Sequence, residues 1–188
     1  MVRHPQGARR DVIPDQVRDD GPAPLVVTAE LPADLQAWAE RLRRAHYPPD
    51  RNEVPAHVTL FRALPPSCEA ELGDALVAVA RDHPPVPARM EGVRPLGTGT
   101  ALAIASPAML ALRAELAERF FGLLTPQDRS DPRLHVTIQN KVSEKVAKAL
   151  QAELAGTFGP REFRFAGVAL HRYRGGPWEP VKRWSFRG

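Results

Sequence analysis

Hydrophobic and polar positions follow two different periods along the chain from residue 24 onward. Short apolar-rich stretches typical of strands occur over 25–31, 57–62, 86–95, 100–105, 134–141, 162–173 and 178–187. Apolar residues recur at helical spacing over 34–46, 68–82, 107–121 and 143–156. The pattern therefore predicts an α+β fold in which helices and strands are interspersed.

The order of these elements occurs twice. A helix, a strand with a histidine, a second helix and two further strands follow one another in 33–105 and again in 106–187. Repeated units in a small chain usually pack as related lobes around a shared core. We therefore expect one bilobal domain over 24–188 with a pseudo-two-fold axis. Its two antiparallel sheets would face each other across a central cleft, with helices outside.

The composition argues against a secreted, membrane-spanning or disulfide-linked protein, and it leaves a polyanionic ligand possible. Residues 1–23 hold few large apolar residues and balanced charge, so we expect a disordered arm there, with no signal peptide. No apolar run is long enough to cross a bilayer and Cys68 has no partner for a disulfide, so we expect a cytoplasmic protein off the membrane. Residues 161–188 hold seven basic and two acidic residues, a formal charge of +5. This basic stretch either attracts a polyanion such as RNA or keeps edge strands soluble.

The same tripeptide stands on the corresponding strand of both repeats, as His57-Val58-Thr59 and His135-Val136-Thr137. Alternate residues of a strand share a face, so the histidine and threonine of each motif would point to one side, with valine buried behind them. One such tripeptide is common on a strand surface and indicates nothing. Two of them at equivalent positions of a repeat indicate a common site.

Paired imidazoles suit phosphodiester chemistry. A base must remove a proton from the attacking oxygen while an acid protonates the leaving oxygen, and the histidine pKa of about 6.5 allows both roles near neutral pH. Threonine hydroxyls can donate hydrogen bonds to the remaining phosphate oxygens. No cysteine pair, His-x-His or carboxylate cluster accompanies the motifs, so we expect neither a metal nor a cofactor.

The stretches His57-Val58-Thr59-Leu60 and His135-Val136-Thr137-Ile138 resemble the paired signature of the two-histidine (2H) phosphoesterases, specifically the bacterial 2′-5′ RNA ligase-like proteins. The resemblance covers about residues 24–187, including the order of elements. It implies an enzyme that acts on 2′,3′-cyclic phosphates of RNA or nucleotides and that joins RNA ends through a 2′-5′ linkage in reverse. It also implies that His57 and His135 are the acid and base, and that Thr59 and Thr137 bind the phosphate.

Four further side chains are candidates for substrate binding. Phe61 continues the His57 face and either stacks on a base or packs in the core. Gln139 and Lys141 continue the His135 face, where Lys141 either attracts phosphate or is simply solvated. Tyr173, with the two tryptophans of the last hairpin, either forms a stacking platform or packs that hairpin.

A module that binds an RNA end or a nucleotide without significant turnover is the alternative function. The intact histidine pair favours the enzyme, because binding alone requires no acid and base. In either case we expect a monomer whose partner is an RNA end or a nucleotide cyclic phosphate.

Overall fold

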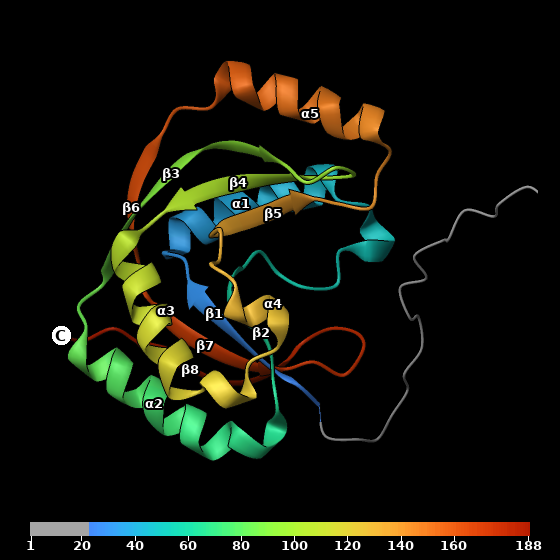
Figure 1. The fold of residues 1–188 in the computed structure, drawn as a ribbon. Coiled ribbons are helices and arrows are strands. Elements are labelled where there is room, and N and C mark those ends of the chain that lie inside the picture. Colours follow the sequence, from blue (N-terminus) through green and yellow to red (C-terminus); the bar gives the residue numbers. More distant parts are fainter. Residues whose placement is uncertain (1–22) are drawn as a thin grey trace, which may run out of the picture.

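The computed structural model describes residues 23–188, which form two four-stranded antiparallel sheets with helices around them (Figure 1). The expected α+β fold is therefore confirmed. Of the disordered arm predicted over 1–23, residues 1–22 lie outside the described part. Ala23 is buried and belongs to the domain.

Each sheet has one strand with a histidine motif at its edge. In the first sheet the strands lie in the order β2 (Val58–Leu64), β1 (Leu25–Glu30), β7 (Gly167–Arg172) and β8 (Glu179–Ser185). In the second sheet the order is β5 (His135–Gln139), β4 (Thr100–Ala105), β3 (Val86–Pro95) and β6 (Arg161–Phe165). The edge strands β2 and β5 contact each other, so the two motifs meet where the sheets approach.

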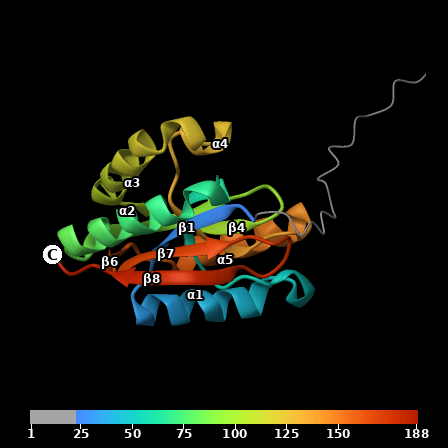
Figure 2. The same cartoon turned by 90° about the horizontal axis from the view of Figure 1, so that it is seen from below.

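Helices cover the two sheets from outside. They are α1 (Ala33–His46), α2 (Glu69–Asp82), α3 (Pro107–Arg119), the short α4 (Pro126–Arg129) and α5 (Glu144–Thr157). The helix α5 packs on the second sheet and α2 on the first (Figure 1), while α1 and α3 lie on opposite sides of β1 and β7 (Figure 2). Ser106 and Ser143 are the N-caps of α3 and α5, because the hydroxyl of each accepts a hydrogen bond from the backbone N–H three residues later.

The two repeats are interleaved. Strands β3 and β4 come from residues 33–105 but form a sheet with β5, which comes from 106–187. Conversely, β2 from the first repeat shares its sheet with β7 and β8 from the second. The units 33–105 and 106–187 therefore do not correspond to the two sheets, and each motif strand lies in a sheet with the last two strands of the other repeat.

The single strand predicted over 162–173 is wrong, because the chain changes sheets at Ala166. The backbone N–H of Ala166 donates to the carbonyl of Glu30 at 2.8 Å, and β6 and β7 on either side of it lie in different sheets. Gly167, the first residue of β7, lies against the backbone of β8. A Cβ there would stand 2.1 Å from the carbonyl oxygen of Trp184, so only glycine lets β8 approach this closely.

Two classes of feature are absent from residues 23–188. No helix in this range is long and apolar enough to cross a membrane. No three His, Cys, Asp or Glu side chains in this range gather as a group that could hold a metal ion. Cys68 is buried and free.

Candidate active site

The two motifs present their histidines and threonines on one face, as the alternation predicts. His57 directly precedes β2 and His135 begins β5. Val58 and Val136 are fully buried behind them. The histidine and threonine of each motif are only half-buried, so all four side chains remain within reach of a ligand.

Both imidazoles are held in the same way. Nδ1 of His57 lies 2.7 Å from the carbonyl oxygen of Pro55, and Nδ1 of His135 lies 2.6 Å from that of Arg133. Since a carbonyl oxygen only accepts hydrogen bonds, each Nδ1 is assigned the proton in both cases. The other ring nitrogen, Nε2, is then left to exchange a proton with a ligand.

The surroundings favour the neutral form of both rings. The pKa of His57 is lowered to about 4, chiefly by burial. The positive charges of Arg43, His171 and His135 act in the same direction, and the hydrogen bond to the Pro55 carbonyl opposes them. Burial likewise lowers the pKa of His135 below 6.5. In the free protein at neutral pH, both Nε2 atoms are therefore mostly unprotonated and ready to accept a proton.

A β-bulge follows each motif at the same position. In β2 the pairing with β1 passes from Thr59 to Phe61 and skips Leu60. In β5 the pairing with β4 passes from Thr137 to Gln139 and skips Ile138. An extra residue reverses the face on which the following side chains lie. The bulges therefore end the ligand-facing row of side chains at the two threonines.

These bulges overturn two of the predicted binding residues. Phe61 is 1% exposed and Gln139 is 2% exposed, so both side chains point into the core rather than continuing the histidine faces. The guanidinium carbon of Arg113 lies 4.7 Å from the centre of the Phe61 ring. The amide oxygen of Gln139 accepts a hydrogen bond from the hydroxyl of Thr100 at 3.1 Å. Neither side chain is available to stack on a base or bind a phosphate.

Arg43 of α1 connects the two motif strands. Its side chain is buried and donates to the carbonyl of Val54, before His57, and to the carbonyl of Thr137 in β5, both at 2.7 Å. The side chains of Gln36 and Glu40, on the same face of α1, bond to the carbonyl and the N–H of Ala56. The helix thereby fixes the loop that supplies the carbonyl for His57.

Arg113 of α3 makes the equivalent contact with the other motif strand, β2. Its buried guanidinium donates to the carbonyl of Leu60, at the bulge of β2, and to that of Asp128. The Asp128 carboxylate in turn accepts from the N–H groups of Arg62 and Ala63 at 2.9–3.0 Å. One buried arginine from each repeat therefore holds the motif strand of the other repeat next to its bulge.

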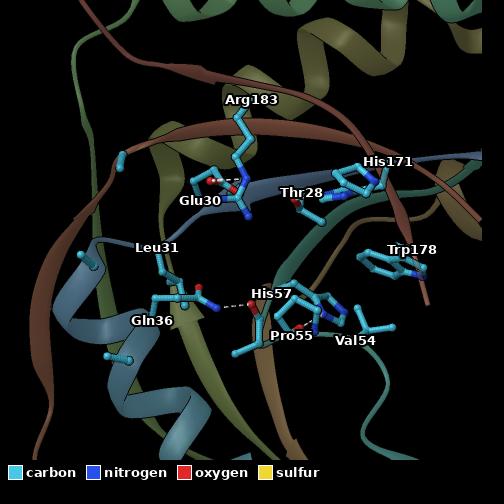
Figure 3. Close-up of a pocket in the computed structure, with 16 residues that line it drawn as sticks. Thr28, Glu30, Leu31, Gln36, Val54, Pro55, His57, His171, Trp178 and Arg183 are labelled. Atoms are coloured by element: carbon cyan, nitrogen blue, oxygen red, sulfur yellow. Dashed lines mark hydrogen bonds and ion pairs between the residues drawn. The ribbon is translucent and has the colours of Figure 1, made fainter.

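A pocket of about 630 Å³ opens beside His57, and the rings of His171 and Trp178 also line it (Figure 3). The ring of Trp178 lies 4.5 Å from that of His57 and 5.4 Å from that of His171, between centroids. A ring nitrogen of His171 bonds to the hydroxyl of Thr28 at 3.2 Å. On the other side of the pocket, Arg183 pairs with Glu30. This pocket is lined mainly by apolar side chains, and the ring of Trp178 is part of its wall.

His171 enters the site without any signal from local sequence, whereas Trp178 is one of the two hairpin tryptophans that the sequence offered as a stacking surface. His171 belongs to no motif. It reaches the pocket because β7 lies inside the first sheet, where it pairs with β1. Trp178 arrives from the loop between β7 and β8. Of the other two predicted binding residues, Lys141 is exposed after β5 and Tyr173 is 45% exposed, and neither lines this pocket.

A second pocket, of about 220 Å³, lies beside His135 and is lined by polar residues. Thr59 and His135 line it together with the side chains Arg62, Arg94, Arg113 and Arg133. The first motif therefore contributes its threonine to the same pocket as the histidine of the second motif, which places both motifs around one centre.

Comparison with known proteins identifies the chain's family. The family model described as the 2′-5′ RNA ligase superfamily matches residues 31–177, which is well over half of the chain. The chain belongs to the 2′-5′ RNA ligase superfamily. The matched range contains both histidine motifs and ends just before Trp178.

Solved structures share the fold of this superfamily member. TT0787 of Thermus thermophilus is 18% identical with a TM-score of 0.61, over 88% of this chain and 98% of that protein. A structure described as a phosphoesterase is 20% identical with a TM-score of 0.60, over 89% and 100%. E. coli LigT complexed with 3′-AMP is 20% identical with a TM-score of 0.55, over 89% and 100%. No curated protein matches the sequence. The superfamily comprises phosphoesterase- and ligase-like enzymes, and its fold is the one described above.

Proposed function

We propose that this protein is a metal-independent phosphoesterase that opens the 2′,3′-cyclic phosphate of an RNA end or a nucleotide. The observation that supports this most directly is the matched support of His57 and His135, each with its Nδ1 held by a backbone carbonyl two residues earlier. This support leaves two equivalent Nε2 atoms for acid and base catalysis.

The reaction assigns a role to each side chain of the motifs. One Nε2 removes a proton from water as the water oxygen bonds to phosphorus. The other imidazole, protonated at Nε2, gives its proton to the ribose oxygen as the opposite P–O bond breaks. The hydroxyls of Thr59 and Thr137 donate to the non-bridging oxygens, where negative charge accumulates. With a 5′-hydroxyl in place of water, the same steps form a 2′-5′ linkage.

The pocket beside His57 supports a nucleoside as the group that carries the phosphate. LigT, which shares the fold, was crystallised with 3′-AMP. Trp178 lines the pocket and offers an aromatic face next to His57, and stacking on aromatic side chains is how proteins commonly hold an unpaired base.

The test is hydrolysis of an oligoribonucleotide that ends in a 2′,3′-cyclic phosphate, in the presence of a chelator. We expect turnover, with a single phosphomonoester isomer that phosphorus NMR identifies. A folded protein that binds the oligonucleotide and leaves the cyclic phosphate intact would instead be the non-catalytic binding module.

The dependence of kcat/KM on pH is expected to be bell-shaped with its maximum below pH 6.5. Activity requires one neutral and one protonated imidazole. The rate therefore rises as pH rises through about 4, where His57 loses its proton, and falls as pH passes the lowered pKa of His135. The same shifts make the folded state less stable as pH falls from 6.5 towards 4, because the folded protein resists protonation of both rings. A rate that only increases with pH and is lost in chelator would contradict the mechanism.

Replacing Trp178 by alanine is expected to raise KM by roughly five- to a hundredfold, which is the usual cost of losing one base–aromatic stack. Tyr173→Ala is the matched control, because Tyr173 lies at the other end of the same loop and does not line the pocket. Steady-state kinetics with a nucleoside 2′,3′-cyclic phosphate compares the two variants. Equal effects on KM would contradict the stacking role of Trp178.

A further inference from the structure

The charge next to the two histidines is strongly uneven. The pocket beside His135 is lined by four arginines and two aspartates, a formal charge of +2. Among the residues that line the pocket beside His57, Arg183 and Glu30 are opposite charges that pair with each other. A ligand that extends on both sides of the catalytic centre therefore meets positive charge only on the His135 side.

None of the four arginines makes an ion pair with an acidic side chain of residues 23–188, and three of them are candidates for binding a ligand. They are Arg62, Arg94 and Arg133. Arg62 and Arg133 are exposed, and Arg94 donates only to the carbonyl of Arg133, at 3.2 Å. Their guanidinium groups therefore keep most of their donors for a ligand.

Neither acidic side chain of the same pocket forms an ion pair with one of its arginines. The Asp128 carboxylate is buried and is occupied by the backbone N–H groups of Arg62 and Ala63. Asp131 is exposed at the rim. The fourth arginine, Arg113, is buried and bonded to the backbone.

In the basic C-terminal stretch, by contrast, four of the seven basic side chains form ion pairs. Arg161 pairs with Asp34, and Arg183 pairs with Glu30. Arg172 and Arg174 both pair with Glu179. Arg164, Lys182 and Arg187 form no ion pair within the described residues, but none of the three lines either pocket. The unpaired positive charge next to the histidine motifs therefore lies beside His135.

We propose that Arg62, Arg94 and Arg133 bind a second phosphate of the substrate, on the 5′ side of the nucleoside whose cyclic phosphate reacts. Guanidinium groups bind phosphate through paired, charge-assisted hydrogen bonds. The group bound is either the 5′-phosphate of a nucleotide or the next phosphodiester of an RNA strand. This inference rests on the proposed function and narrows its substrate to one with at least two phosphates.

Three substrates separate the two sources of the second phosphate. They are adenosine 2′,3′-cyclic phosphate, the same compound with a 5′-phosphate, and a diadenosine dinucleotide that ends in a 2′,3′-cyclic phosphate. We expect kcat/KM to be at least about tenfold higher for a substrate with the second phosphate than for the first compound. A gain already present in the 5′-phosphorylated compound identifies a phosphate monoester as sufficient. A gain only in the dinucleotide identifies the RNA strand. Equal values for all three would overturn the proposal.

The double variant Arg62→Gln, Arg133→Gln tests the residues. We expect the ratio of kcat/KM between the substrates with and without the second phosphate to fall towards one. The ratio cancels any effect of these charges on His135 itself. Arg41→Gln, Arg44→Gln removes the same charge from the exposed surface of α1 and should leave the ratio unchanged. A ratio that survives in the first double variant would overturn the assignment.

A binding measurement keeps the test independent of turnover. The affinity for an oligoribonucleotide with a 3′-phosphate is measured by fluorescence anisotropy over a range of salt concentrations. For each arginine–phosphate interaction that a variant removes, the slope of log K against log salt should decrease by about 0.7 in magnitude. If the wild type binds with this salt dependence but hydrolyses nothing, the proposed function fails while the phosphate site stands. An unchanged slope in Arg62→Gln, Arg133→Gln overturns the phosphate site, whether or not the enzyme turns over.

Discussion

Replacing either His57 or His135 by alanine is expected to lower kcat by about 10²- to 10⁴-fold for a 2′,3′-cyclic phosphate substrate. Each variant removes one of the two groups that transfer protons at the phosphorus, and the remaining imidazole cannot act on both sides of an in-line displacement. The double variant should lose little more activity than either single variant, because residues that act together have non-additive effects.

His46→Ala is the control for these variants. His46 ends α1, and no hydrogen bond involves its ring within the described residues. Steady-state turnover and thermal unfolding of the wild type and the four variants separate loss of chemistry from loss of fold. A single histidine variant that is folded and keeps a tenth or more of the wild-type kcat would disprove the paired mechanism.

Replacing Arg43 by methionine is expected to reduce the free energy of unfolding by about 3–5 kcal/mol. The change removes donors from the carbonyls of Val54 and Thr137 and from the side chain of Asn52, in a region where water has little access. Hydrogen bonds to a charged group contribute about 1.5–3 kcal/mol each, and a buried acceptor left without a donor adds a penalty. Urea unfolding measures the loss.

Two further variants make this result interpretable. Arg44→Met changes the next residue, which is exposed, and should alter stability by no more than about 0.5 kcal/mol. Arg43→Lys keeps the charge but loses the planar guanidinium group, so its free energy of unfolding should fall between those of the wild type and Arg43→Met. A loss below about 1 kcal/mol in Arg43→Met would show that water replaces the guanidinium, and that Arg43 does not hold the two strands together.

The fold class and both motif faces were predictable because they depend on local periodicity. Val58 and Val136 are buried where strand alternation requires. The helix caps at Ser106 and Ser143 were likewise predictable, since one side chain bonds to the backbone three residues later. A few neighbouring residues in the sequence are enough to specify each of these features.

The bulges and the change of sheet were not predictable from alternation. The run from His57 to Arg62 fits an unbroken strand, which places Phe61 on the histidine face. The extra residue is visible only in the pairing of β2 with β1. Similarly, nothing around Ala166 interrupts the apolar pattern except Gly167, whose need for space comes from β8, nearly twenty residues later.

The charge of the site depends equally on tertiary structure. A count of basic residues pointed to the C-terminal stretch, but a count does not show which arginines meet a carboxylate. Arg172 lies far from Glu69 in sequence and is paired with it in the fold. Arg62, Arg94 and Arg133 come from three separate segments and are brought together only by the contact between the two sheets.

The matching carbonyl supports of His57 and His135 have a consequence for what happens between turnovers. When the proposed hydrolysis ends, the ring that acted as base holds a proton and the ring that acted as acid has lost one. Neither ring has to flip or change tautomer, since the Nδ1 proton of each stays on its carbonyl throughout. The enzyme thus finishes each cycle already set for the opposite direction, and one proton passed from ring to ring through water restores it for the next hydrolysis.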